Sequence, residues 1–254
     1  MCYSDHARPP LSPLQGAAED HGDLRLTAAD GTRFAAYEAR AAKPSGRGMV
    51  ILPDVRGLHD FYKELVVRFA EAGFDAVAID YFGRSAPNDD RSEAFDYKPH
   101  TAQTTSEMVA QDVRAAVERL RRSAGDRVRA VFSVGFCWGG SASWRQSGEG
   151  HGLAGAIGFY GGRPMTRAAA AIPRMRAPLL MLLAGVDSTP PQEFAQFADA
   201  VRARGLEVEA HTYPGAPHSF FDRSFAEHAK ACDDAWRRIL DFTARLTPVA
   251  ARAT

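Results

Sequence analysis

Residues 131–140 decide the fold, and they read VFSVGFCWGG. The first four residues predict a buried strand, and the residues after Gly140 favour a helix. Gly135 and Gly139, two positions on either side of Cys137, let the strand and helix backbones pass closely at a sharp turn. A G-x-C-x-G pattern between a strand and a helix is typical of a nucleophile elbow, here with cysteine in place of serine.

The position of Cys137 at the start of the predicted helix suggests a reactive thiol. A helix N-terminus directs backbone N–H groups and a partial positive charge at the sulfur, and we expect this to lower the thiol pKa. The alternative is a buried structural cysteine in a glycine-rich turn, because short motifs also occur by chance. The strand–turn–helix context favours the reactive cysteine.

On both sides of this stretch, predicted strands alternate with predicted helices. Asp30-Gly31 between two extended runs predicts an opening hairpin. The alternation that follows predicts a mainly parallel sheet with helices on both faces. The expected strands are 24–27, 34–37, 49–52, 75–80, 128–134, 153–159, 178–184 and 208–213, and the expected helices are 60–72, 104–120, 190–204 and 225–246.

Composition predicts one globular domain. The chain has 254 residues, of which 45% are hydrophobic and 24% charged. We expect residues 1–22 to form a loosely ordered arm and residues 23–247 to form the domain. A net charge of zero speaks against a nucleic-acid partner, and no apolar run is long enough for a membrane span. Three scattered cysteines do not indicate a disulfide framework, so we expect a cytoplasmic protein. We also expect a monomer or a weak homo-oligomer.

Two further residues follow strands at the same predicted sheet edge as Cys137. Asp187 follows the strand over 178–184, and His218 follows the strand that ends at Tyr213. The order nucleophile, acid, histidine is that of serine hydrolases with a nucleophile elbow. We therefore expect His218 to take the thiol proton and Asp187 to orient it. A helix N-cap and a solvated loop histidine are the plainer interpretations, and His211 is a weaker rival for the base.

Backbone N–H groups near Cys137 are candidates for an oxyanion hole. In this kind of site one donor belongs to the residue after the nucleophile, here Trp138. The other comes from the loop after an early strand, here residues 53–57, and we predict Val55.

These motifs together resemble the dienelactone hydrolase family, and the resemblance covers roughly residues 24–245. The matching segments are GFCWGG at 135–140, AGVD at 184–187, YPGAPHSF at 213–220 and IDYFGR at 79–84. The resemblance implies the α/β-hydrolase fold and hydrolysis of dienelactone, also called carboxymethylenebutenolide, to maleylacetate during degradation of aromatic compounds. It implies no metal and no cofactor.

The resemblance also implies residues that bind a carboxylate on the substrate. Arg84 matches the family's arginine after the fourth strand, and a planar guanidinium suits a bidentate carboxylate contact. A plain surface arginine is the alternative. The family's second arginine position is Asp222 here, and Arg223 comes one residue later. We also assign Tyr81 and Ser219 to the substrate site.

The first active-site loop departs from the family pattern. Asp54 stands where the family has a glutamate beside the thiol, and its side chain is shorter by one methylene. The resemblance implies that Asp54 takes the catalytic place of that glutamate. The long irregular stretch over residues 82–103 is typical of a functional or mobile loop.

The sequence thus predicts a cysteine hydrolase of small esters or lactones, with a substrate that carries a carboxylate. A broad carboxylesterase or thioesterase is the first alternative, and a neutral ester would gain little from Arg84. A ligand-binding protein without catalysis is the second, and the complete set of three residues speaks against it. A metal hydrolase is disfavoured because no H-E-x-x-H or paired-cysteine motif occurs.

Overall fold

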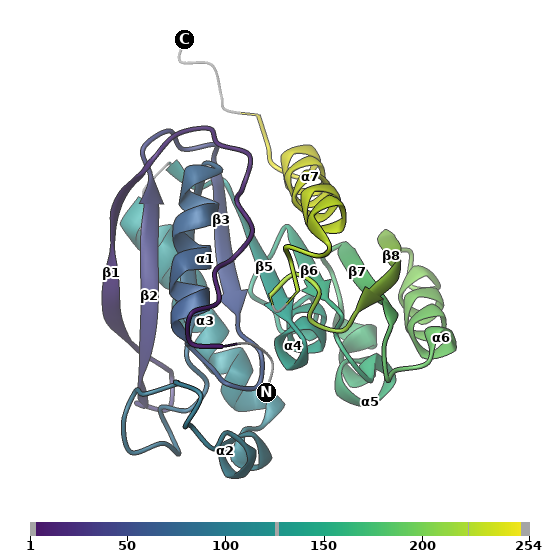
Figure 1. Cartoon of the computed structure of the whole chain (residues 1–254), viewed down its shortest axis with the longest axis horizontal. Coiled ribbons are helices and arrows are strands. Elements are labelled where there is room, and N and C mark those ends of the chain that lie inside the picture. The colour runs from purple at the N-terminus through teal and green to yellow at the C-terminus, as the bar shows by residue number, and fades with distance from the viewer. Residues whose placement is uncertain (1–3, 125–126, 223, 250–254) are drawn as a thin grey trace.

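An eight-stranded sheet forms the centre of the molecule (Figure 1). The computed structural model describes residues 4–124, 127–222 and 224–249. The strands lie in the order β1-β2-β4-β3-β5-β6-β7-β8. They are β1 (Ala18–Thr27), β2 (Arg33–Ala41), β3 (Arg47–Leu52), β4 (Phe74–Ile79), β5 (Ala130–Phe136), β6 (Gly155–Phe159), β7 (Leu179–Val186) and β8 (Val208–Pro217).

The strand directions confirm the predicted sheet. β1 pairs antiparallel with β2, and β2 pairs antiparallel with β4, whereas all other neighbours are parallel. Gly31 turns the opening hairpin with φ +84°, a backbone conformation that glycine adopts at little cost. The molecule has the predicted α/β-hydrolase architecture, a mostly parallel sheet with an antiparallel N-terminal hairpin.

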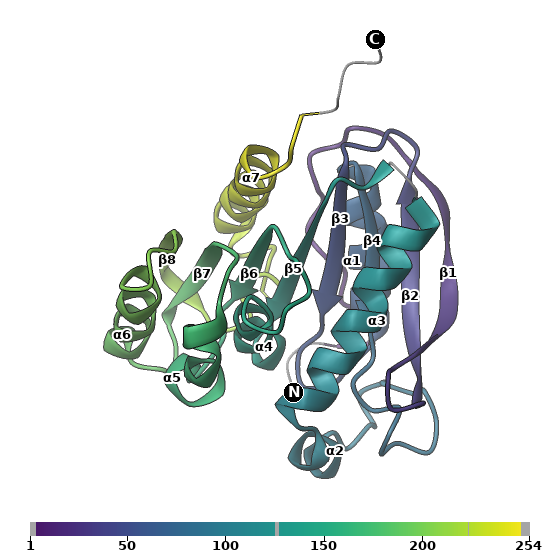
Figure 2. The ribbon, with the colours of Figure 1, turned by 180° about the vertical axis from the view of Figure 1, so that it is seen from behind.

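Helices cover both faces of the sheet (Figures 1 and 2). On one face α1 and α7 bury one apolar cluster, and on the other α3, α4 and α6 bury two more. No helix of the described residues is long and apolar enough to cross a membrane. The helices are α1 (Asp60–Glu71), α2 (Lys98–Gln103), α3 (Ser106–Ala124), α4 (Trp138–Gln146), α5 (Pro164–Arg167), the 3-10 helix η2 (Ala169–Arg174), α6 (Pro191–Arg202) and α7 (Ala229–Arg245).

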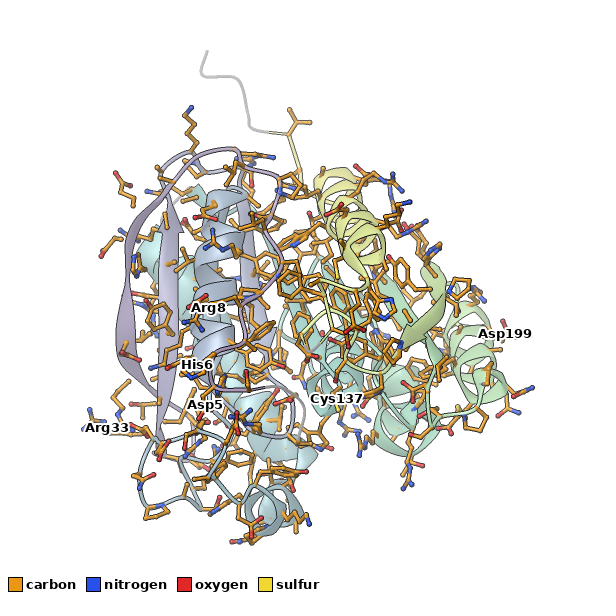
Figure 3. The ribbon with its side chains drawn as sticks, viewed as in Figure 1. Asp5, His6, Arg8, Arg33, Cys137 and Asp199 are labelled. Atoms are coloured by element: carbon orange, nitrogen blue, oxygen red, sulfur yellow. The ribbon has the colours of Figure 1, made fainter. Side chains whose placement is uncertain are left out.

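The described part of residues 1–22, which we expected to form an arm, contacts the domain. Asp5 lies beside α1 (Figure 3), and its carboxylate is 2.9 Å from the His59 ring. The Ser12 hydroxyl is buried and donates a hydrogen bond to a backbone carbonyl of α1. β1 begins at Ala18, so regular structure starts before the predicted domain boundary.

Local signals placed the start of α3 imprecisely. The sequence predicted a helix from residue 104, but α3 begins at Ser106, and the Thr105 hydroxyl accepts the Met108 N–H at 3.2 Å. Helices α2, α5 and η2 were not predicted, because segments of four to six residues are too short to show a helical period.

A buried ion pair ties the long segment after β4 to the sheet. The Arg91 guanidinium donates two hydrogen bonds of 2.9 Å to the Asp80 carboxylate, and both side chains are almost fully buried. Asp80 also accepts the backbone N–H groups of Leu58 and Phe82. The same guanidinium lies 4.4 Å above the ring of Phe95. These contacts hold the first part of the 82–103 segment at the carboxyl end of β4.

Replacing Arg91 by methionine is expected to destabilise the fold by about 3–5 kcal/mol, because Asp80 would keep a buried charge without its partner. Urea unfolding of Arg91→Met and wild type measures this difference. The matched control is Arg25→Met, which removes an exposed pair with Asp89 and should cost less than about 1 kcal/mol. Equal losses in the two variants would contradict the structural role of Arg91.

Candidate active site

Cys137 occupies a strained turn between β5 and α4. Its backbone has φ +54° and ψ −115°, a conformation that residues other than glycine rarely adopt. The turn requires small neighbours. A Cβ on Gly135 would lie 1.8 Å from the Gly139 carbonyl oxygen, and one on Gly139 would lie 2.1 Å from that of Pro53. The two glycines therefore bring β5, α4 and the loop after β3 together, and Cys137 lies at the lower edge of the sheet in Figure 3.

The electrostatics of Cys137 differ from the sequence-based expectation. Burial, followed by the negative charges of Asp54 and Asp222, raises the pKa of the Cys137 thiol to about 12. The Trp138 backbone N–H and the charge of Arg167 lower this pKa, but by less. The expectation of a thiol with a lowered pKa was wrong, because the effect of the helix N-terminus is smaller than the cost of a buried anion. At neutral pH the thiol keeps its proton.

His218 and Asp187 form a hydrogen-bonded pair at the carboxyl ends of β7 and β8. His218 Nδ1 lies 2.7 Å from Asp187 Oδ2. The hydrogen bond from His218 and the backbone N–H of Thr189 outweigh burial and lower the Asp187 pKa, so the carboxylate is ionised and Nδ1 carries the proton. This tautomer leaves Nε2 as an acceptor. Within the described residues no hydrogen bond joins His218 to Cys137, and such contacts commonly form only with substrate present.

The rival histidine has a different neighbour. His211 lies on β8 with Nε2 3.7 Å from Asp234 of α7, and its ring packs edge-on against Tyr213. It is therefore part of the β8–α7 contact rather than the pair with Asp187.

Val55 and Trp138 have backbones that suit the predicted oxyanion hole. Val55 is half-buried in the turn after β3, and among the described residues its N–H donates to no protein acceptor. Trp138 is the first residue of α4, and its N–H is directed at the Cys137 sulfur. Both N–H groups can therefore donate a hydrogen bond to a substrate oxygen.

Two carboxyl groups lie behind the thiol in the protein interior. Asp54 is fully buried, and its Oδ1 accepts the Arg56 backbone N–H at 2.9 Å. Asp222 is 1% exposed, and neither of its oxygens has a hydrogen-bond partner in the described chain, although the hydroxyls of Ser219 and Tyr160 lie nearby. Burial and then the charge of Asp54 raise the pKa of Asp222 well above its usual value. Burial therefore favours the protonated form of the Asp222 carboxyl.

The structure does not bring all predicted substrate-binding residues to the site. Arg84 Nε is 2.9 Å from the Asp30 carboxylate, and its Nη1 is 2.8 Å from that of Asp112. Two carboxyl groups therefore already pair with this guanidinium, and the binding of a substrate carboxylate by Arg84 stays a prediction. Burial raises the pKa of Asp112 to about 7 against the opposite effect of Arg84.

The remaining candidates also point inward or lie outside the described residues. Tyr81 is fully buried and donates its hydroxyl to the Pro53 carbonyl at 2.8 Å, so it supports the loop after β3 instead of binding substrate. Ser219 has φ +65° and is 2% exposed, with its hydroxyl beside Asp222. The predicted contact of Arg223 falls outside the described residues.

One cation near the thiol was not predicted from the sequence. Arg167 ends the one-turn helix α5, and its charge acts on Cys137. No sequence signal could have found it, because α5 is too short to show a period and carries no motif. Among the described residues, no group of three or more histidine, cysteine or acidic side chains could hold a metal ion.

Known proteins share both the fold and the sequence pattern. A model of the dienelactone hydrolase family matches residues 34–247. A protein of Escherichia coli provisionally named carboxymethylenebutenolidase is 27% identical over 252 residues, covering 92% of this chain and 93% of that protein. The carboxymethylenebutenolidase of Pseudomonas putida is 27% identical over 230 residues, covering 88% and 96%. A structure from Klebsiella pneumoniae, provisionally described as a dienelactone hydrolase, has a TM-score of 0.74 at 23% identity, covering 89% of this chain and 100% of that one, and shows the common fold.

Replacing Asp54 by asparagine is expected to lower the Cys137 pKa, because a like charge beside the thiolate is removed while the Oδ1 acceptor stays. Alkylation by iodoacetamide at pH 8, followed by mass spectrometry of the Cys137 peptide, should accelerate about tenfold. Asp222→Asn serves as the comparison and should accelerate alkylation less, because burial already favours the protonated form of Asp222. An unchanged rate in Asp54→Asn would show that the charge of Asp54 does not control the thiol.

Asp222→Asn is also expected to stabilise the fold at high pH. Because the folded-state pKa is raised, the unfolded chain ionises at a lower pH than the folded one, and stability is lost as pH rises above about 4. Asparagine removes this loss, so the variant should be more stable than wild type at pH 8 and nearly equal to it at pH 4. Urea unfolding at both pH values tests this. The control Asp199→Asn, on an exposed face of α6 (Figure 3), should show no such pH dependence.

Proposed function

Because the chain belongs to the dienelactone hydrolase family, we propose that it hydrolyses a small ester or lactone with Cys137 as nucleophile. His218 acts as the general base, and Asp187 orients it. The observation that carries this proposal is the 2.7 Å contact between His218 Nδ1 and Asp187 Oδ2. Both residues directly follow strands, at the edge of the sheet where Cys137 occupies its strained turn. The three residues follow the chain order of hydrolases with a nucleophile elbow.

The first half of the reaction forms a thioester. As Cys137 Sγ attacks the ester carbonyl carbon, its proton passes to His218 Nε2, so the reaction does not require a resting thiolate. The carbonyl oxygen becomes an oxyanion that accepts hydrogen bonds from the backbone N–H groups of Val55 and Trp138. When the carbon–oxygen bond breaks, the leaving oxygen takes the proton from His218.

The second half releases the acid. A water molecule gives a proton to His218 Nε2 while its oxygen attacks the thioester carbon. The carbon–sulfur bond then breaks, and His218 returns the proton to Cys137. Asp187 stays ionised throughout and stabilises the imidazolium in both halves. Asp54 and Asp222 favour the protonated thiol, which protects the resting Cys137 from oxidation.

Dienelactone is the substrate that we propose first, with maleylacetate as its product. A cysteine nucleophile suits a leaving group that is stable as an anion, and the enolate of an enol lactone is such a group, whereas the amine of a peptide is not. We place the activity in the cytoplasm and in the breakdown of aromatic compounds, since Cys137 must stay reduced to act.

A broad carboxylesterase or thioesterase is the second candidate. The observation that favours it is the double ion pair of Arg84 with Asp30 and Asp112, which removes the cation expected to select dienelactone. A binding protein without catalysis is a weaker candidate, because the proposed nucleophile, base and acid are all present.

Hydrolysis of cis- and trans-dienelactone, followed by ultraviolet absorbance, tests the proposal beside p-nitrophenyl acetate. Wild type should hydrolyse at least one of these compounds, and Cys137→Ala should lose about 10³-fold or more of that rate, because no thioester can form. The matched control is Cys232→Ala, which removes the buried thiol of α7 and should keep the rate per folded molecule.

The substrates separate the candidates. Activity on dienelactone that disappears in Cys137→Ala supports the first candidate, and activity on the simple ester alone supports the second. Equal rates in wild type and Cys137→Ala would overturn the cysteine mechanism. Wild-type protein that is folded but inactive on every compound would favour the binding role.

A further inference from the structure

Residues 4–17, which we call the strap, lie along α1 before β1 begins. The strap contacts α1 at successive points, namely the Arg8–Glu64 ion pair of 2.9 Å, the hydrogen bond from the Ser12 hydroxyl to the Arg68 carbonyl, and those from the Gln15 and Gly16 N–H groups to the Glu71 carbonyl. These contacts place Asp5 at the N-terminal end of α1. Figure 3 shows Asp5 at the same end of the sheet as Cys137.

Asp5 joins the strap to two other segments at this end of the sheet. Its Oδ1 accepts hydrogen bonds from Arg56 Nη2 at 3.0 Å, from His59 Nε2 at 2.9 Å and from the Glu93 backbone N–H at 2.9 Å. His59 Nδ1 accepts a hydrogen bond from the Phe61 N–H, so the ring proton lies on Nε2. Burial lowers the pKa of His59, and the hydrogen bond from His59 lowers the pKa of Asp5. At neutral pH a neutral imidazole and a guanidinium therefore share one carboxylate oxygen.

Arg56 belongs to the turn after β3 that carries Val55, a proposed oxyanion donor. The start of this turn is fixed by the core, where the Tyr62 hydroxyl accepts the Asp54 N–H at 3.0 Å. The far side is held by the side chain of Arg56, which is 3% exposed and donates hydrogen bonds to the strap and, at 3.1 Å, to the Arg91 carbonyl. Because Val55 lies between these two anchors, the direction of its N–H depends on both.

We propose that Asp5 is a positioning residue for hydrolysis, which acts through Arg56 and holds the N–H of Val55 toward the oxyanion. The inference rests on the proposed function and extends the site to the strap. The bond from Val55 to the oxyanion forms fully only in the transition state, so its loss lowers kcat and leaves KM unchanged.

Kinetics of Asp5→Ala on p-nitrophenyl acetate and dienelactone, whichever wild type hydrolyses, test the positioning role. Loss of an oxyanion donor costs about 10²–10³ in rate, and a donor that is displaced but present should cost less, so we expect kcat to fall about tenfold at constant KM. Asp5→Glu keeps the carboxylate and should restore most of the lost rate. The matched control Asp23→Ala removes an exposed carboxylate paired with Lys63 and should stay within about twofold of wild type.

Alkylation of Cys137 by iodoacetamide separates positioning from a general loosening of the site. The sulfur displaces iodide from a saturated carbon, so no oxyanion forms. The alkylation rate of Asp5→Ala should therefore stay within about twofold of wild type, whereas a loosened site should react faster, because an exposed thiol loses its proton more readily.

Amide hydrogen exchange follows the turn without any substrate. In Asp5→Ala the peptide that covers residues 53–58 should exchange at least about tenfold faster than in wild type, because one anchor of the turn is lost. Peptides of β5 and α4 should exchange as in wild type, and Asp23→Ala should show no change in either region.

The outcomes distinguish this inference from the proposed function. If Asp5→Ala keeps the wild-type kcat, or if residues 53–58 exchange as in wild type, the inference is wrong and the hydrolase remains. If KM rises at constant kcat, or if alkylation accelerates as kcat falls, Asp5 supports substrate binding or the fold as a whole, which also overturns the inference. If wild type hydrolyses neither compound, the proposed function fails and the positioning role fails with it.

Discussion

The close approach of three backbone segments at Cys137 is the constraint on which the rest of the structure depends. β5, the start of α4 and the loop after β3 come so near that Gly135 and Gly139 have no space for a Cβ. This contact fixes the Trp138 N–H at the sulfur and brings the loop that carries Asp54 and Val55 to the same place. A single local geometry thus sets the positions of the proposed nucleophile and its oxyanion hole.

Burial, more than the helix N-terminus, controls the charges at this turn. The thiol is enclosed with Asp54 and Asp222 behind it, so its pKa rises to about 12 although a helix begins at the next residue. A partial charge at a helix end contributes about 0.3–1 kcal/mol at an exposed site, which is small beside the cost of a buried anion near a carboxylate. The resting thiol is therefore protonated, and a histidine base is required for the sulfur to react.

The cations of the molecule differ in whether a carboxylate has already paired with them. Arg91 and Arg84 have structural partners, Asp80 in one case and Asp30 with Asp112 in the other. Arg167 forms no ion pair with the described residues, and its charge lowers the pKa of Cys137.

The sequence by itself determined the fold class and the three residues proposed for catalysis. Buried parallel strands are continuous apolar runs, the glycine spacing around Cys137 is local, and Asp187 and His218 each follow a strand, so their common edge could be inferred without coordinates. Only the tertiary structure decided the thiol pKa, the burial of Tyr81 and Ser219, the pairing of Arg84 and the position of Arg167. These depend on side chains far apart in the chain, such as Asp30 and Asp112 around Arg84, and on burial from all sides. A sequence pattern shows the periodicity of its own helix or strand. It does not show which charged residues from distant parts of the chain pack against that element.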